Sequence, residues 1–167
     1  NIRKRISLDV LPRDGKHVYQ PGILYRMAEA YLGYAEALNE SSPAPTPDVY
    51  KYVNLIRERA GIPALKEGLS KEEMRAAIQQ ERRVEFNCDG IRFHDLRRWK
   101  IADKYLGGKL YGMNHDGSEK SDDVNNPKAF YKRTYYKSRT FNKRMYLWPF
   151  PQAQMDINPN LRQAPGY

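Results

Sequence analysis

Two glutamates, Glu81 and Glu85, have the spacing in this chain that best suits acid–base chemistry. At about 100° per residue, they fall on the same helix face as Met74, Ile78 and Cys88. Two carboxylates roughly 6 Å apart on one face could act as acid and base in the hydrolysis of a sugar chain.

The residues around these glutamates favour a different role. Several arginines are near in sequence, and a guanidinium held by two carboxylates keeps both ionised, whereas a general acid needs a raised pKa. We therefore expect a structural ion network rather than a catalytic pair. Its expected members are Glu81, Glu85, Arg92, Asp95 and Arg98, with Arg82 and Arg97 as further partners.

A second candidate surface lies in residues 130–148, where aromatic residues alternate with lysines and arginines. This pattern can bind single-stranded nucleic acid through stacking and phosphate contacts. It can also bind carbohydrate through the apolar faces of sugar rings, or it can cover a helical core. We expect residues 107–129 and 130–148 to hold the ligand surface, because loops on a rigid scaffold usually carry recognition. The candidate ligand residues are Tyr111, Tyr131 and Tyr135.

Other reactive residues give little support for catalysis or cofactor binding. Cys88 is the single cysteine, which excludes an internal disulfide and a cysteine-rich zinc site. The three histidines lie far apart and no phosphate-binding or dinucleotide-binding glycine motif is present, so no metal and no cofactor is expected. We expect Cys88 in the core, His94 on the surface, and Trp99 in the core beside Leu96 rather than as a sugar-stacking platform.

The composition is ordinary for a globular domain, with 40% hydrophobic and 29% charged residues. A length of 167 residues suffices for one domain with its own core, and no apolar run of about 18 residues predicts a transmembrane helix. A formal charge of +9 would suit an anionic partner, but the basic residues are spread along the chain, which favours a solvated surface. Residues 1–5 include neither a Met nor an apolar signal region, so we expect a fragment.

Two helices are expected in the first part of the chain. Apolar spacing predicts one over residues 23–40, with Leu24 and Met27 on its buried face and small residues on a second face. Thr46 should cap the next helix, and Gly61 should end it. The two helices together resemble a tetratricopeptide-like hairpin.

Two further helices should carry the glutamates and arginines. Ser70 and Glu73 form a capping box at the start of one helix, which should run to about Cys88. The other is expected over residues 91–106 and should end at Gly107.

The predicted fold is mainly α, with tetratricopeptide-like helical hairpins, long irregular loops and a Pro-rich C-terminal tail. We expect a single domain over residues 1–167. Within it, residues 1–22 form an extended arm, 23–106 a helical scaffold, and 107–167 a loop and a tail that wraps the helices.

Four segments, in this order, resemble the SusD/RagB family of nutrient-binding lipoproteins. They are Tyr25–Leu32 with Tyr34–Glu40, then Val53–Gly61, then Glu81–Trp99, and finally Tyr146–Pro151 with Asn158–Tyr167. One such match alone would be a weak signal, whereas four in the right order and spacing are specific. The chain is similar only to the C-terminal part of the family, whose full members are much longer.

The resemblance implies an outer-membrane lipoprotein exposed at the cell surface. Family members bind oligosaccharide, or in some cases peptide, over a SusC-like TonB-dependent transporter, and they are not enzymes. The expected partners are therefore that transporter, the oligosaccharide or peptide, and the missing N-terminal part of the same protein, without nucleic acid. The quoted motifs resemble scaffold, so no ligand residue is carried over.

Two other functions stay open from the residues alone. The chain could be a helical-repeat scaffold that binds protein through the small-residue face of its first helix. It could also be a basic nucleic-acid-binding module, which steep salt-dependent binding to polynucleotide without oligosaccharide binding would favour.

Overall fold

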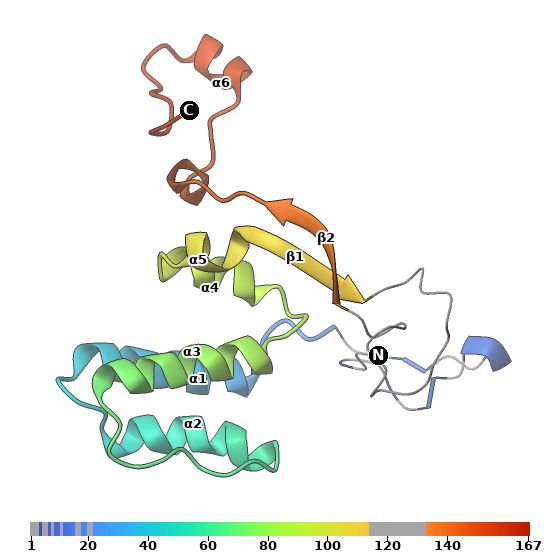
Figure 1. The fold of residues 1–167 in the computed structure, drawn as a ribbon, viewed down its shortest axis with the longest axis vertical. Helices are drawn as coiled ribbons and strands as arrows, with labels where there is room; N and C mark the ends of the chain where they lie inside the picture. Colours follow the sequence, from blue (N-terminus) through green and yellow to red (C-terminus); the bar gives the residue numbers. More distant parts are fainter. Residues whose placement is uncertain are drawn as a thin grey trace. The chain divides into compact units, whose positions relative to one another are not determined.

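A computed structural model describes residues 4, 7, 9, 10, 12–15, 18, 19, 22–113 and 133–167. The chain divides into two compact units, Asn1–Arg92 and Phe93–Tyr167. The structure is mainly α-helical, which confirms the predicted fold class (Figure 1). Half of the predicted arm over residues 1–22 lies outside the described residues, and a 3-10 turn is present at Pro12–Asp14.

The first helix, α1, spans Met27–Ser41 and starts later than expected. Its buried face consists of Ala28, Leu32, Ala35 and Asn39. The prediction that Leu24 and Met27 are buried was wrong, since they are 89% and 62% exposed. The reason lies at Arg26, which has an extended backbone and whose guanidinium bonds Glu85, so that the helix begins only after this residue.

The second helix, α2, spans Pro47–Arg59, with Thr46 at the predicted N-cap position and Gly61 in the left-handed region at φ +69°. The chain then runs back along α2. The Leu65 amide donates to Asn54 Oδ1 at 2.9 Å, and the Leu69 amide donates to the Tyr50 hydroxyl at 2.9 Å. The next helix therefore starts beside the start of α2 and runs in the same direction (Figure 1).

This third helix, α3, spans Lys71–Glu85 and begins with the predicted capping box. The Glu73 amide donates to Ser70 Oγ at 3.2 Å, and the Ser70 amide donates to Glu73 Oε2 at 2.8 Å. The helix ends before Cys88, which has a left-handed φ of +65° and is exposed. The expectation of a buried Cys88 was wrong because the helical stripe stops where the chain leaves the helix.

Helix α1 packs against both α2 and α3, and the core of the first unit lies between these three helices (Figure 1). Its fully buried side chains include Leu32, Val49, Val53, Met74 and Ile78. Asn39 is also buried and joins α1 to α3 by donating to the Lys71 carbonyl at 3.1 Å. Further polar contacts between the same two helices are those of Arg75 with Glu40 and of Arg82 with Glu36.

The predicted helix over residues 91–106 is two helices, α4 at Ile91–Arg98 and α5 at Ala102–Leu106. Between them, Lys100 has a left-handed φ of +54°, and the Ile101 amide donates to the Leu96 carbonyl at 3.0 Å. This pattern ends a helix much as a C-terminal glycine would. Leu96 is buried as expected, whereas Trp99 is only half-buried.

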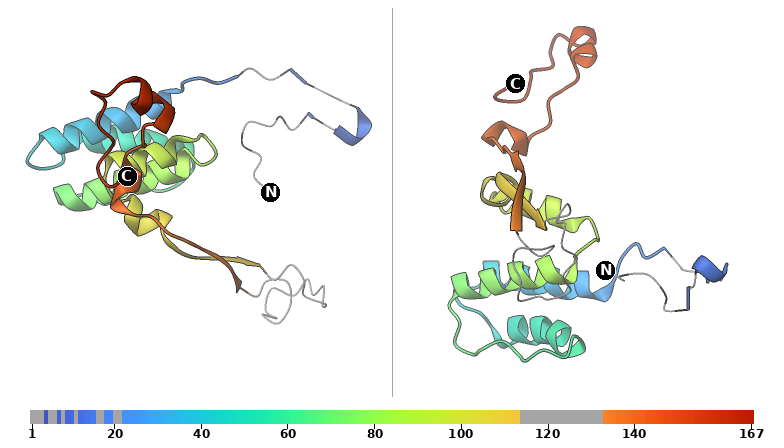
Figure 2. Two further views of the ribbon diagram at one scale, coloured as in Figure 1. Left: turned by 90° about the horizontal axis from the view of Figure 1, so that it is seen from above. Right: turned by 45° about the vertical axis from the view of Figure 1, so that its right-hand side comes forward.

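The second unit also contains an antiparallel hairpin of β1, Gly108–Met113, and β2, Arg133–Arg139 (Figure 2). The expectation of a loop was therefore wrong for residues 108–113, because their pairing partner lies on a distant segment and their glycines conceal the strand pattern. The remaining chain contains a 3-10 turn, Lys143–Tyr146, and a short helix, α6, Gln152–Ile157. That this tail wraps the helices stays a prediction.

Candidate functional site

Glu81 and Glu85 lie at one end of the three-helix unit. Arg57 donates to the Glu81 carboxylate, and both Arg26 and Arg59 donate to Glu85. The two glutamate side chains are 11% and 12% exposed. Because α2 and α3 run in the same direction, the arginines at the end of α2 reach the glutamates at the end of α3.

A lysine and an arginine form hydrogen bonds with oxygen atoms at the C-terminal end of α3. Lys4 Nζ donates to the carbonyl of Glu85 at 2.6 Å and to Asp89 Oδ2 at 2.8 Å. Arg26 Nη2 reaches the same two groups, at 2.7 and 2.8 Å. Cations at the C-terminal end of a helix are favourable because the unpaired carbonyls there carry partial negative charge.

The arginine partners differ from those expected from the sequence. The neighbouring arginines Arg82, Arg92, Arg97 and Arg98 were expected, whereas the bonds come from Arg26, Arg57 and Arg59. Local spacing did not show this because the return of the chain along α2 sets which arginines lie beside α3.

The contacts and burial of the other residues expected in the network are as follows. Arg98 Nε donates to Asp95 Oδ1 at 2.9 Å, within the second unit. Arg92 is half-buried at the end of the first unit, and Arg82 lies 3.8 Å from Glu36. A single network that includes all five expected residues stays a prediction.

The bonds to arginine and lysine keep the carboxylates ionised. Burial raises the pKa of Glu85, but hydrogen bonds from Arg59 and Arg26 outweigh it and leave that pKa below the ordinary value. The pKa of Asp89 is lowered against the effect of burial by hydrogen bonds from Lys4 and Arg26. A carboxylate with a lowered pKa is a poor proton donor near neutral pH, so this cluster is suited to structure rather than acid catalysis.

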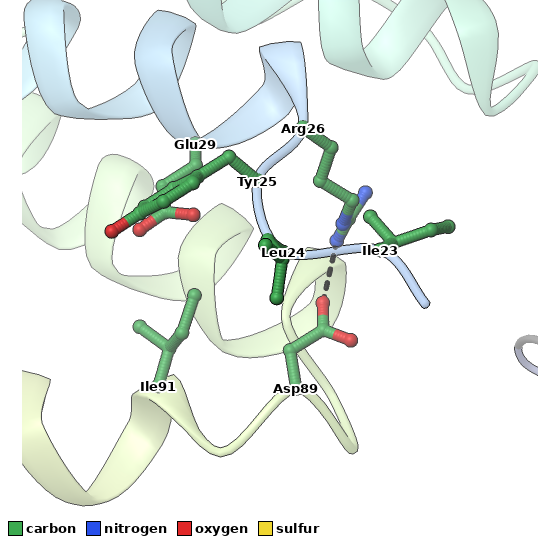
Figure 3. Close-up of a pocket in the computed structure, with 7 residues that line it drawn as sticks. All are labelled: Ile23, Leu24, Tyr25, Arg26, Glu29, Asp89 and Ile91. Carbon is green, nitrogen blue, oxygen red and sulfur yellow. Dashed lines mark hydrogen bonds and ion pairs between the residues drawn. The ribbon is translucent and has the colours of Figure 1, made fainter. Parts of the chain in front are cut away.

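A pocket of about 390 Å³ lies in the first unit beside the start of α1 (Figure 3). Its lining consists of Ile23, Leu24, Tyr25, Arg26, Glu29, Asp89 and Ile91. Arg26 and Asp89, which carry opposite charges, are bonded to each other in the pocket wall. The remaining lining combines the apolar side chains of Ile23, Leu24 and Ile91 with the Tyr25 hydroxyl and the Glu29 carboxylate.

The hairpin brings two of the predicted ligand residues together. Tyr111 on β1 is paired with Tyr135 on β2, and their ring centroids are 6.3 Å apart at an interplanar angle of 81°. Both side chains remain open to solvent, at 46% and 57% exposure. Tyr131, the third candidate, lies outside the described residues.

Residues paired across an antiparallel hairpin point to the same side of it. Because β1 alternates, Lys109, Tyr111 and Met113 share one side with their partners, while Leu110 lies on the other side with Lys137. Between Leu110 and Tyr111 the pairing is irregular, because Tyr136 on β2 has no partner on β1. Ser138, beyond this extra residue, therefore lies on the same side as Tyr135. We call the first side the tyrosine face, and it consists of Lys109, Tyr111, Met113, Arg133, Tyr135 and Ser138.

Contacts within the tyrosine face hold its side chains in place. The Arg133 guanidinium lies over the Tyr111 ring, 4.1 Å from its centroid, and the Tyr135 hydroxyl is 3.0 Å from Ser138 Oγ. Sequence reasoning missed Lys109, Arg133 and Ser138 as site residues. The alternation of basic and aromatic residues in β2 was the available signal, but assigning a face required the strand pairing.

Within the described ranges, no group of three or more His, Cys, Asp or Glu side chains could hold a metal ion. The helices described for this chain are all too short or too polar to cross a membrane.

The described chain is therefore a mainly helical protein with two exposed tyrosines on a β-hairpin. The chain belongs to the SusD family, whose model matches residues 2–167. This match confirms the resemblance seen in the four sequence motifs.

Individual relatives agree with this assignment. The chain is 33% identical over 150 residues to SusD-like protein P2 of Formosa agariphila, across 85% of this chain and 25% of that protein. Its fold is similar to a SusD-like protein of Bacteroides fragilis, with a TM-score of 0.73, 36% identity, and coverage of 87% of this chain and 26% of that one. A SusD-like carbohydrate binding protein of the same species gives a TM-score of 0.67 at 34% identity, over 83% and 28% of the two chains. The chain thus spans about a quarter of the length of these relatives.

Proposed function

We propose that this chain is part of a cell-surface protein that binds glycan nutrients without cleaving them. In this proposal, the protein delivers its ligand to a SusC-like TonB-dependent transporter in the outer membrane. Membership of the SusD family supports the proposal, and one similar solved protein is described as carbohydrate binding. Peptide is the other ligand class compatible with the family resemblance.

The feature of this chain that supports glycan binding is the exposed pair of Tyr111 and Tyr135. An aromatic ring can cover the apolar face of a sugar ring, while hydroxyl and guanidinium groups beside it bind the sugar hydroxyls. Ser138 and Arg133 provide such groups on the same face. Because these side chains contact one another before any ligand arrives, little conformational entropy is lost on binding.

A titration of the 167-residue chain with neutral and acidic oligosaccharides, followed by calorimetry, tests the proposal. We expect Tyr111→Ala and Tyr135→Ala each to weaken the best ligand about tenfold, since a well-placed aromatic anchor contributes more than ~1 kcal/mol. Tyr136→Ala is the matched control, because this exposed tyrosine lies on the same strand but has no paired residue on β1. Unchanged affinity in both test variants, or an equal loss in the control, would contradict a site on the tyrosine face.

Surface location and delivery rest on family membership alone and need a separate test. The coding sequence upstream of this chain should contain a lipoprotein signal with its cysteine, and a transporter gene should lie beside it. A full-length protein that neither reaches the outer membrane nor copurifies with the neighbouring transporter would contradict this part of the proposal.

A further inference from the structure

The charge of the hairpin narrows the ligand class. Strands β1 and β2 contain four cations and no acidic residue: Lys109, Arg133, Lys137 and Arg139. All four side chains are exposed, and none forms an ion pair with another described residue. Glu81, Glu85 and Asp89 of the first unit, in contrast, are bonded to cations of that unit.

Two of these cations flank the tyrosine pair on the tyrosine face. Lys109 precedes Tyr111 by two residues, and Arg133 is paired with Met113 at the far end. The distance along the strand from Lys109 to Met113 is about 13 Å at the usual rise per residue. Because the Arg133 guanidinium reaches back over the Tyr111 ring, a short oligosaccharide beside the two tyrosines would meet both a lysine and an arginine.

Arg133 is oriented to bind an anion. Its planar guanidinium lies against the Tyr111 ring, which uses the flat face of the group and leaves the N–H donors around its edge available. These donors match the geometry of a carboxylate or a sulfate, which Arg binds with two parallel hydrogen bonds. Stacking on Tyr111 also restricts the rotamers of Arg133, which lowers the entropy lost when the anion binds.

We propose that the tyrosine face binds an anionic oligosaccharide whose carboxylate or sulfate groups pair with Arg133 and Lys109. This inference rests on the glycan-binding function proposed above and specifies its ligand class. Single-stranded nucleic acid fits less well, because successive stacked bases need parallel rings, and the two tyrosine rings meet at 81°.

The test compares saccharides that differ only in charge. Oligogalacturonides and their methyl esters share one backbone, and sulfated and desulfated galactan oligosaccharides form a second such pair. We expect the 167-residue chain to bind at least one charged form roughly tenfold more tightly than its neutral counterpart, as expected for charge-assisted hydrogen bonds. The uronate and sulfate arms then distinguish which anion is preferred.

The matched variants carry the same change of net charge on opposite sides of the hairpin. The double variant Lys109→Gln, Arg133→Gln should abolish most of the preference for the charged form, because it should weaken binding of the charged form much more than binding of the neutral form. Lys137→Gln, Arg139→Gln should retain the preference, because these side chains pair with Leu110 and Gly108 on the other side. Far-UV circular dichroism confirms that both variants fold like the parent chain.

The outcomes separate the two proposals. If no saccharide binds, or binding is indifferent to Tyr111→Ala and Tyr135→Ala, the proposed glycan site fails. If saccharides bind through the tyrosines but charged and neutral forms bind equally, only the anionic class is overturned. An equal loss in the two double variants would attribute the preference to overall charge and overturn the site-specific proposal. Tighter binding of a thymidine oligonucleotide, lost in the Lys109, Arg133 variant, would assign the face to nucleic acid instead.

Discussion

In the three-helix unit, arginines meet carboxylates, whereas on the β1–β2 hairpin an arginine lies over an aromatic ring. Glu81 and Glu85 are almost completely covered, and each is bonded to at least one guanidinium. Arg133 and Lys109 on the hairpin are exposed and lack a carboxylate partner among the described residues. The difference follows from burial, because a covered charge must be paired, while an exposed one is stabilised by water.

This comparison separates charges that maintain the fold from charges available to a ligand. Breaking a covered ion pair should affect stability strongly, because the remaining partner stays desolvated. Removing an exposed cation should hardly affect stability, and its effect should appear in binding.

Glu81→Ala should lower the free energy of unfolding by about 3 kcal/mol, because it leaves the Arg57 guanidinium without its carboxylate. Urea denaturation of the parent chain and the variant measures the change. Glu72→Ala is the control, since this residue lies on the same helix with a side chain that is 75% exposed. A similar small change in both variants would show that burial does not distinguish the two glutamates.

Acid should destabilise the first unit through Glu85 and Asp89. Their pKa values are lowered in the folded state, so their contribution is complete above the ordinary values of 4.5 and 3.8. It is lost as the pH falls from these values through the lower pKa values of the folded state, because in that range the unfolded chain takes up protons more readily than the folded chain. Denaturation curves between pH 7 and pH 3 should show this loss, and Glu85→Gln should reduce its size. Identical pH profiles would exclude Glu85 as a contributor.

Ser70→Ala should cost about 1 kcal/mol, since it removes the side-chain oxygen that accepts from the Glu73 amide. Thr46→Ala is a matched control, because Thr46 occupies the N-cap of α2 but its side chain makes no capping bond. We expect a clearly smaller change there by thermal unfolding. Equal losses would indicate that the capping bond of Ser70 contributes little.

The Lys109→Gln, Arg133→Gln variant should change the free energy of unfolding by no more than about 0.5 kcal/mol, as is usual for exposed positions. The same urea titration used for Glu81→Ala provides the measurement. A loss comparable with that of Glu81→Ala would mean that these cations support the fold, which would remove the division between the two regions.

Hydrolysis should be undetectable, and this is the smallest expected effect. The carboxylate of Glu85 is held ionised by arginines, so it is a poor proton donor near neutral pH. Product analysis after long incubation with oligosaccharides, peptides and nucleotides measures any turnover. Activity that disappears in a folded Glu85→Gln variant would show that the cluster is an active site.

Local signals in the sequence were sufficient to predict that α1, α2 and α3 exist, although not every end of these helices. The capping box of Ser70, the stop at Gly61 and the stripe that carries Glu81 depend on neighbours within a turn or two of helix. Such signals failed where the chain departs from a regular helix. Lys100 divides the helix predicted over residues 91–106, and Arg26 delays the start of α1.

By itself, the sequence determined the helical class, the family, and the position of Glu81 and Glu85 on a buried face. It also indicated Tyr111 and Tyr135 as candidate ligand residues. Tertiary structure decided which groups meet. The return of the chain along α2 selects Arg57 for Glu81, and strand pairing places Arg133 beside Tyr111. The physical reason is range: helix periodicity and capping act between near neighbours, whereas ion-pair partners and strand register depend on segments that are distant in sequence.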